Sequence, residues 1–437
     1  MSSDFGALLL NGVERQTGLI QRLAAAIKER RHLSYIDHSL KDLLAQRIYQ
    51  SACGYADGND ANTLRRDPMF KLAVGRAPLD DTTDLASAPT FSRLENSLTR
   101  KDCYRLARAF VEQFIASYPA PPEAIVLEMD HSEDPTHGQQ ELAFYNHHYR
   151  NRCYLPLFIF EGLSGKLVTA ILRPGKRPTG KENSAVVKRV LHLLREHWSD
   201  TNIILRGDGH FANPELMALC EADDNLDFIF GMTGNQRLSR LAEPIMQRAR
   251  ALHKTRCDNA CRTDETAPAV TRLFDDIDYA ARSWPASYRV VCKAEVMALG
   301  DNPRFVVTSL TEPTPETIYA QLYCARGQGE NFIKAIKNEL ASDRTSDHTF
   351  LANHLRLYYA CAAYVLIHSL KDNTLRHTEL AKAQPMGLIL KLFKIAVRVV
   401  QYKDRIKLHL PTSCTVKHLL QRVTEILYLV PPNPSPA

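Results

Sequence analysis

The chain has few of the features that mark secreted, membrane-spanning or disordered proteins. Its ten cysteines are scattered over 437 residues without the close, even spacing of a disulfide scaffold, which favours reduced thiols. The longest apolar stretch, 358–370, is too short to cross a bilayer, and the first residues lack a basic leader. Aromatic residues contribute only 8%, yet 45% of residues are hydrophobic and 24% charged, so we expect a globular cytoplasmic protein of two or three domains with no membrane partner.

Positive charge is only slightly in excess, with a formal net charge of +6. Sequence-independent affinity for DNA depends on local groups of Lys and Arg rather than on the chain average. One such group is the loop 173–181, RPGKRPTGK, which contains Lys176 and Arg177; another is the segment 391–407. For both groups, DNA contact and an ordinary solvated surface remain open.

Three acidic residues lie at the ends or beginnings of predicted elements. Asp130 closes the apolar run 124–129, and Asp208 follows the run 202–207 between two glycines; both runs predict buried strands. Glu330 begins a helical segment whose apolar stripe includes Ile333 and Ile336, while Glu330 and Lys334 fall on the opposite face.

Magnesium prefers oxygen ligands, and a two-metal phosphoryl-transfer site needs about three carboxylates that converge from separate elements. The three acids meet that requirement. Taken singly, a strand-terminal Asp is also a common turn or capping residue, and a Glu in a first helical turn also complements the helix dipole.

The order of elements favours the catalytic interpretation. Strands are predicted at 124–130, 153–161 and 166–172, followed by a helix at 184–198, a strand at 202–208, a helix at 214–222 and a strand at 226–232. A later helix carries Glu330. This βββαβαβ order, with acids after the first and fourth strands, resembles the α/β ribonuclease H-like core of DDE transposases and integrases.

Four residues strengthen that resemblance. Tyr323, Arg326, Glu330 and Lys337 fit a Tyr-x2-Arg-x3-Glu-x6-Lys signature of bacterial insertion-sequence transposases. The chain also resembles insertion-sequence family thirteen-eighty over nearly its whole length, in the segments 127–141, 205–211, 302–308 and 322–337, followed by 343–346.

The resemblance implies a DDE transposase that binds the terminal inverted repeats of its element and performs cut-and-paste transposition by DNA cleavage and strand transfer. Asp130, Asp208 and Glu330 would be the catalytic residues and the ligands of two Mg²⁺ ions, with Mn²⁺ also possible. The expected DNA contacts are Tyr323, Arg326, Lys334, Lys337, Lys176 and Arg177. Double-stranded DNA would be the partner of a homodimer or larger assembly, bound at the nucleoid.

The expected organisation has three parts. Residues 1–120 read as a helical DNA-binding domain. Residues 121–345 form the catalytic core, and a β-rich insertion at about 240–320 accounts for the 121 residues, 209–329, between Asp208 and Glu330. Residues 346–437 are expected to be a helical region that ends in the floppy proline-rich segment 431–436.

Several side chains allow two interpretations each. Glu128 is either an auxiliary metal ligand or, more simply, a solvated strand-edge acid. Cys257 and Cys261 have the spacing of half a zinc site but lack a second pair. Trp284 could stack on a flipped base or belong to the core. His131 and its neighbours at 137, 147 and 148 are expected to form hydrogen bonds or face DNA rather than to bind metal.

Two other functions share the same residues. A structure-selective nuclease with a ribonuclease H-like fold would keep the acids but would cut DNA without joining it. A non-catalytic, DNA-binding derivative of a transposase would keep the helices and basic loops, but its acids would be free to drift. The presence of all three acids favours an active enzyme.

Overall fold

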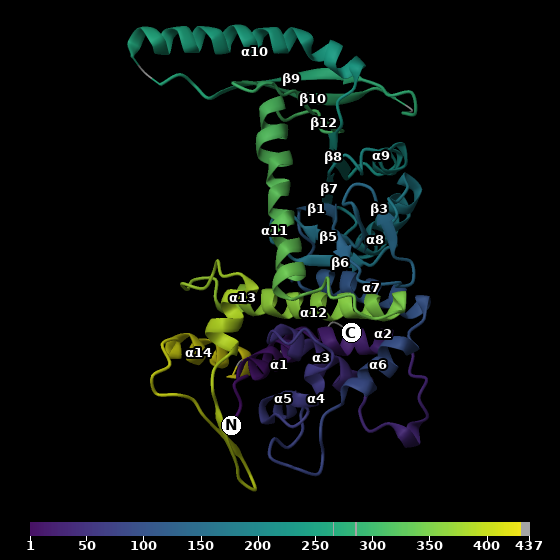
Figure 1. The fold of residues 1–437 in the computed structure, drawn as a ribbon, viewed down its shortest axis with the longest axis vertical. Coiled ribbons are helices and arrows are strands. Elements are labelled where there is room, and N and C mark those ends of the chain that lie inside the picture. Colours follow the sequence, from purple (N-terminus) through teal and green to yellow (C-terminus); the bar gives the residue numbers. More distant parts are fainter. Residues whose placement is uncertain (265, 285, 430–437) are drawn as a thin grey trace.

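The protein is elongated and consists of stacked parts. The computed structural model describes residues 1–264, 266–284 and 286–429, so the proline-rich segment 431–436 lies outside the described residues. A long helix, α10 (Gln236–Thr263), lies across one end, and a sheet follows below it. A second long helix, α12 (Phe350–Thr374), crosses between the sheet and a group of helices at the other end (Figure 1).

One large mixed sheet organises the molecule, in the strand order β11-β10-β12-β8-β7-β1-β5-β6, with β9 also paired to β10. β1 pairs in parallel with β7, and β7 with β8, whereas β1 with β5 and β5 with β6 are antiparallel. The bounds are β1 Ala124–His131, β5 Leu157–Glu161, β6 Leu167–Ile171, β7 Asn202–Gly207, β8 Leu226–Met232, β9 Val270–Tyr279, β10 Tyr288–Met297, β11 Gly300–Asp301 and β12 Arg304–Thr308.

The strands of the region that was expected to be a β-rich insertion extend the main sheet. β12 pairs antiparallel with β8, β10 with β12, and β9 with β10. The region expected to be β-rich nevertheless begins with a helix, because residues 236–263 form α10, which packs on β9 and β10. The sequence interpretation also did not anticipate β9, whose apolar residues are interrupted by three Asp.

Helices cover both faces of the sheet. One core joins α8 (Gly180–His197), α9 (Pro214–Glu221) and α10 to apolar side chains of β1, β7 and β8. A second core joins β5 and β6 to α11 (Gly327–Lys334) and α12. The apolar periodicity of α8 and its Thr179 capping box explain why this segment is helical, with one face buried.

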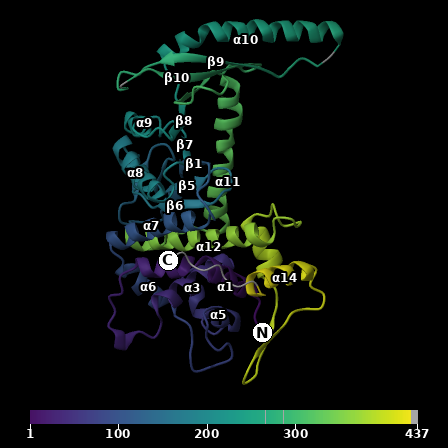
Figure 2. The same cartoon turned by 180° about the vertical axis from the view of Figure 1, so that it is seen from behind.

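The N-terminal segment is helical, as the apolar spacing predicts. It comprises α1 Gly6–Thr17, α2 Leu19–Ala26, α3 Leu40–Ala52, α4 Asp60–Leu64, α5 Pro68–Ala73, α6 Ala88–Ser97 and α7 Arg100–Ala116. These helices share one hydrophobic core with α12, α13 (Pro385–Leu388) and α14 (Lys417–Thr424). The N-terminal helices and α14 therefore pack together, and Figure 2 shows them side by side from behind.

Two small sheets lie outside the main one. The expected strand 153–161 is divided into β4 (Asn151–Tyr154) and β5, and β4 pairs with β2 (Asp134–Pro135) and β3 (Phe144–Asn146). The C-terminal region, expected to be helical, also contains a hairpin of β13 (Arg398–Gln401) and β14 (Ile406–His409). Among the described residues, none of the helices combines the length and the hydropathy that a membrane span needs. All ten cysteines are free thiols.

Candidate active site

Two of the three acids lie next to each other because their strands are parallel. β1 and β7 run side by side, with Met129 opposite Gly207. Asp130 and Asp208 come one residue later, so both lie at the carboxyl edge of the sheet. The Asp208 Oδ1 accepts a hydrogen bond of 2.9 Å from the His210 backbone N–H, which orders the turn after β7.

Glu330 reaches this edge from a long helical segment. Residues 317–339 are helical throughout, with π-helical turns at Thr317–Tyr323 and Ala335–Glu339 on either side of a short 3₁₀ turn and α11. Ile333 and Ile336 are buried as the apolar stripe predicts, while Glu330 on the other face is exposed.

Gly329 allows α11 to lie against β1. A Cβ atom at this position would lie 2.7 Å from the Glu128 Cγ, closer than side chains tolerate. We expect Gly329→Ala to push α11 away from β1 and to lower any DNA cleavage by about tenfold to a hundredfold, since small displacements of reacting groups are costly. The matched control is Gly327→Ala, two residues earlier in α11, where an added Cβ would meet nothing within 4 Å. Equal cleavage rates of the two variants would contradict the expectation.

Arg326 connects the acids in this structure. Its guanidinium lies 3.0 Å from Asp130 Oδ2 and 3.6 Å from Glu330 Oε1. Burial raises the pKa of Asp130 to about 6; Arg326 opposes this rise, whereas the negative charges of Asp208 and Glu330 add to it. The site therefore holds more negative charge than Arg326 neutralises.

Asp130→Asn should stabilise the metal-free protein at neutral pH. The folded-state pKa, about 6, lies above the ordinary value of 3.8, so the native state loses stability as the pH rises between the two values. The shift of roughly two units, which already includes the opposing effect of Arg326, corresponds to at most about 3 kcal/mol. Thermal unfolding in chelator at about pH 7.5 and at about pH 4 checks this, because the gain should disappear at the lower pH. A variant less stable than wild type at the higher pH would contradict it.

The residues fit a hard divalent cation by their chemistry. The three carboxylates offer the oxygen ligands that Mg²⁺ prefers, and they come from three different elements. Within the described chain, no group of three His, Cys, Asp or Glu side chains is already arranged closely enough to hold an ion. Since Arg326 contacts both Asp130 and Glu330, it must move from at least one of them before that carboxylate can turn to a cation.

Glu128 is buried and paired with an arginine rather than solvated. The solvated strand-edge expectation is wrong, because its side chain is 1% exposed and forms an ion pair with the buried Arg206, directly opposite on β7. A role as an auxiliary metal ligand stays a prediction. Arg206 NH1 also donates a hydrogen bond of 2.8 Å to the carbonyl of Leu322. The pair thus connects β1, β7 and the segment that leads into α11.

A second buried group lies behind Asp130. His131 stacks on Phe211, with ring centroids 5.1 Å apart, and its Nε2 is 3.3 Å from Arg173 NH1. Arg173 also donates a 2.6 Å hydrogen bond to Asn183 Oδ1. Burial and the charge of Arg173 lower the pKa of His131 to about 3, so His131 is neutral and has a hydrogen-bonding role, as expected.

Tyr323 and Lys337, two of the expected DNA contacts, are engaged within the protein. The Tyr323 hydroxyl lies against Gly231, where an added Cβ would be 2.4 Å away, and burial raises the pKa of this tyrosine. Lys337 donates a hydrogen bond from Nζ to the carbonyl of Glu133. This contact uses one of the three N–H donors of the Lys337 ammonium, so the other two remain for a phosphate.

The other expected contacts are more open. Lys334 is exposed on the same helix as Glu330. Lys176 lies over the ring of Phe144 at 4.3 Å, and Arg177 beside it is exposed. In the described structure no ion pair connects Lys176 or Arg177 to the three acids; the nearby Arg173, at the start of this loop, is the residue that contacts His131.

The structure also bears on the two alternatives given for Trp284 and for the pair Cys257 and Cys261. Trp284 is half-buried between Tyr279 and Tyr288, with ring centroids 5.4 Å from each, which agrees with the core interpretation. Cys257 contacts His253 on α10, with Sγ 3.7 Å from Nε2. Cys261 is exposed one turn further on, and the described residues contain no zinc-type cluster there.

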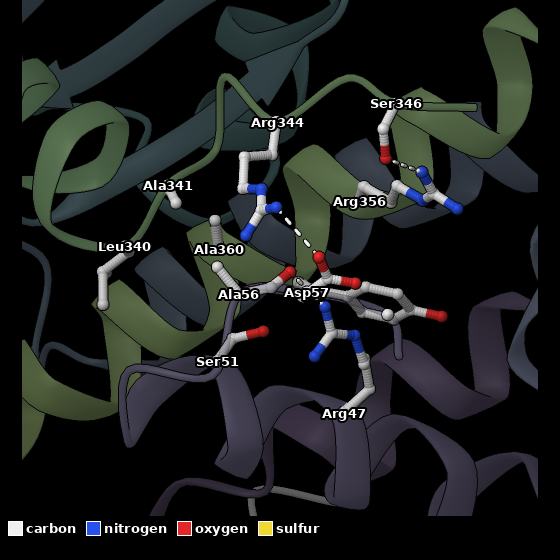
Figure 3. Close-up of a pocket in the computed structure, with 12 residues that line it drawn as sticks. Arg47, Ser51, Ala56, Asp57, Leu340, Ala341, Arg344, Ser346, Arg356 and Ala360 are labelled. Carbon is white, nitrogen blue, oxygen red and sulfur yellow. Dashed lines mark hydrogen bonds and ion pairs between the residues drawn. The ribbon is translucent and has the colours of Figure 1, made fainter. Parts of the chain in front are cut away.

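A cavity lies where the helical segment carrying Glu330 ends (Figure 3). Residues 340–346 and α12 form one wall, and α3 with the loop 56–58 forms the other. Arg344 bridges the gap through a 2.9 Å contact with Asp57, and Arg356 donates to Ser346. None of the expected site residues lines this cavity, whose contacts fasten the end of that segment to the N-terminal helices.

Sequence comparison supplies the family. The family model described as "Transposase DDE domain group 1" matches residues 1–432, so the chain belongs to this family of DDE transposases. No curated protein matches the chain. A solved structure, the piggyBac transposase synaptic complex with hairpin DNA, is similar at 12% identity over 100% of this chain and 87% of that chain, with a TM-score of 0.45.

Proposed function

We propose that this transposase cleaves the ends of its own insertion sequence and joins them to target DNA, using a ribonuclease H-like core with Asp130, Asp208 and Glu330 as the catalytic acids. The strand order β6-β5-β1-β7-β8, with the first three strands antiparallel and the last two added in parallel, supports this core. The Tyr-Arg-Glu-Lys signature supports assignment to insertion-sequence family thirteen-eighty.

The observation that carries the proposal is the contact of one guanidinium with two of the acids. Arg326 reaches Asp130 on β1 and Glu330 on α11, and the charge of Asp208 acts on Asp130 from β7. Acids separated by 77 and 121 residues of sequence thus meet at one edge of the sheet. An excess of negative charge from carboxylates is the condition under which divalent cations bind well.

Each residue then has a defined task. Two Mg²⁺ ions held by the three carboxylates would activate water, and later the freed 3′-hydroxyl, and would offset charge on the phosphate under attack. Arg326, released from Asp130 and Glu330, would turn to that phosphate, which suits its bidentate geometry. Lys334 and Lys337 on the same helix would hold flanking phosphates, and Tyr323 would orient Arg326.

Other parts of the molecule would bring the DNA to this edge. The N-terminal helices would bind the terminal inverted repeats, and the loop with Lys176 and Arg177 would contact the backbone near the cut. Bringing two ends together requires at least a homodimer. The enzyme would act on DNA in the bacterial nucleoid.

The test is a cleavage and strand-transfer assay on duplexes that carry the ends of the element, with Mg²⁺ or chelator. Cleavage and joining that depend on the metal support the proposal, and Mn²⁺ should substitute. Cleavage without joining would favour the structure-selective nuclease. DNA binding without chemistry would favour the non-catalytic derivative.

A further inference from the structure

The β13–β14 hairpin projects from the molecule and has no role in the site described above. It extends beyond the N-terminal helices, at the end of the molecule opposite α10 (Figures 1 and 2). Its two strands pair only with each other, in the register Arg398 to His409 and Val400 to Lys407. Residues 401–407 are all exposed. A free two-stranded hairpin is marginally stable in water, so its base must be held.

The base of the hairpin is held by the body of the protein. Val397, just before β13, forms a bridge with Ser2, with backbone hydrogen bonds of 2.9 and 2.8 Å. The side chain of Gln401 accepts a hydrogen bond of 3.2 Å from the Leu79 backbone N–H. Val399 is buried, and Leu408 opposite it packs against the large core. The hairpin thus has a defined orientation relative to the N-terminal helices.

The two faces of the hairpin differ in chemistry. Residues directly opposite each other on paired strands point to the same side. Val399, Leu408, Gln401 and Ile406 therefore share the face that packs at its base. The other face, which we call the basic face, is formed by Arg398, His409, Val400, Lys407, Tyr402 and Arg405.

The basic face is ordered around an aromatic ring. The Tyr402 backbone N–H donates a 2.8 Å hydrogen bond to the Arg405 carbonyl, which closes a two-residue turn. The Arg405 guanidinium and the Lys407 ammonium lie 5.3 and 5.6 Å from the centroid of the Tyr402 ring. No ion pair neutralises either cation within the described residues. Residues 398–409 contain four Lys or Arg and one Asp, a net charge of +3, against +6 for the whole chain.

We propose that the basic face of the β13–β14 hairpin lies in a groove of double-stranded DNA, at a point remote from the candidate active site. The major groove, about 12 Å wide, admits a two-stranded ribbon whose strands lie about 5 Å apart. Arg405 and Lys407 contact phosphates on the groove walls, and Tyr402 contacts base edges. The inference rests on the proposed function only in requiring duplex DNA as a partner.

Charge favours DNA over a second copy of the chain as the occupant. A homodimeric contact through this hairpin would bring two basic faces together, which costs free energy unless acids intervene, and Asp404 is the one acid in the segment. When DNA binds the same face, Lys and Arg neutralise its phosphates and counterions are released, which favours binding.

The test measures binding without chemistry. A labelled mixed-sequence duplex is titrated with wild type and with Arg405→Ala/Lys407→Ala in chelator, over a range of salt concentrations. Loss of two phosphate contacts should weaken affinity by about tenfold and reduce the slope of log K against log salt by about 0.9 for each contact. The control, Lys188→Ala/Arg189→Ala on the exposed face of α8, removes the same charge and should bind as wild type.

The outcomes separate this inference from the proposed function. If wild type binds duplex and the hairpin variant binds equally well with an unchanged salt slope, the hairpin inference is overturned and the proposed function stands. If wild type does not bind duplex at all, both fail. A hairpin variant that keeps its DNA affinity but changes its mass in sedimentation would identify the hairpin as a contact between protomers, against the proposal. Thermal unfolding of each variant verifies that the fold is intact.

Discussion

Asp208→Asn is expected to abolish DNA cleavage while DNA affinity is retained. Asparagine keeps the oxygen that accepts the His210 N–H, so the turn after β7 should remain in place. It removes the negative charge that a divalent cation requires at this edge of the sheet. Removal of a single charged or polar group that acts on the transition state typically costs about a hundredfold to a thousandfold, and loss of a metal ligand should cost at least as much.

The assay compares the rate of cleavage at the end of the element with the affinity for the same duplex measured in chelator. The control is Asp224→Asn, an exposed acid in the turn before β8 that removes the same charge. The control should cleave at the wild-type rate. If Asp208→Asn also cleaves at that rate, the acid at the end of β7 is not part of the chemistry; if it loses DNA affinity as well, the loss of cleavage says nothing about catalysis.

The positions of the acids could be predicted from sequence because strand ends are visible there. The apolar runs before Asp130 and Asp208 stop where each side chain leaves the core, and parallel pairing brings those ends together. The stripe of Ile333 and Ile336 likewise indicated which side of the helix turns Glu330 outward. These signals are local, and each depends on the period of a single element.

The contacts among charged side chains could not be predicted in the same way. Glu128 was expected to be either an auxiliary metal ligand or a solvated strand-edge acid, and Arg206 was not singled out, yet the two face each other in the interior. A signal does exist, since each lies two residues before a candidate catalytic acid and the two are therefore opposite once the strands are parallel. Recognising it requires the pairing register, which no local pattern supplies.

Two further elements, α10 and the β13–β14 hairpin, could not be predicted, for a different reason. α10 contains Pro244 and many charged residues, so its apolar stripe is thin and its helical pattern weak. The β13–β14 hairpin is defined by its pairing and by anchors at Ser2 and Leu79, which are more than 300 residues away in sequence. Only the charge of this hairpin was visible in the sequence.

Arg206→Met is expected to lower the free energy of unfolding by about 3–5 kcal/mol, because it leaves Glu128 buried without its ion-pair partner. Methionine has a similar length and so limits the cavity, which makes the unpaired charge the dominant cost. The hydrogen bond from Arg206 NH1 to the Leu322 carbonyl is lost as well, which loosens the entry to the Tyr323–Arg326 segment. Denaturant unfolding with a fixed m-value measures the change.

The double variant Glu128→Leu/Arg206→Met separates charge burial from packing. Replacing a whole buried ion pair by apolar side chains is often neutral, so the double variant should regain most of the stability that the single variant loses. A Cβ added at Gly162 would lie 2.5 Å from Arg206 NH2, so the guanidinium is closely packed against this glycine. Side chains of another shape will fill this space less well, which limits how much stability the double variant regains. A double variant as unstable as the single one would mean that shape, and not the unpaired carboxylate, sets the cost. If stability is regained but cleavage is not, the pair positions the helix that carries Arg326 and Glu330, in addition to its part in the core.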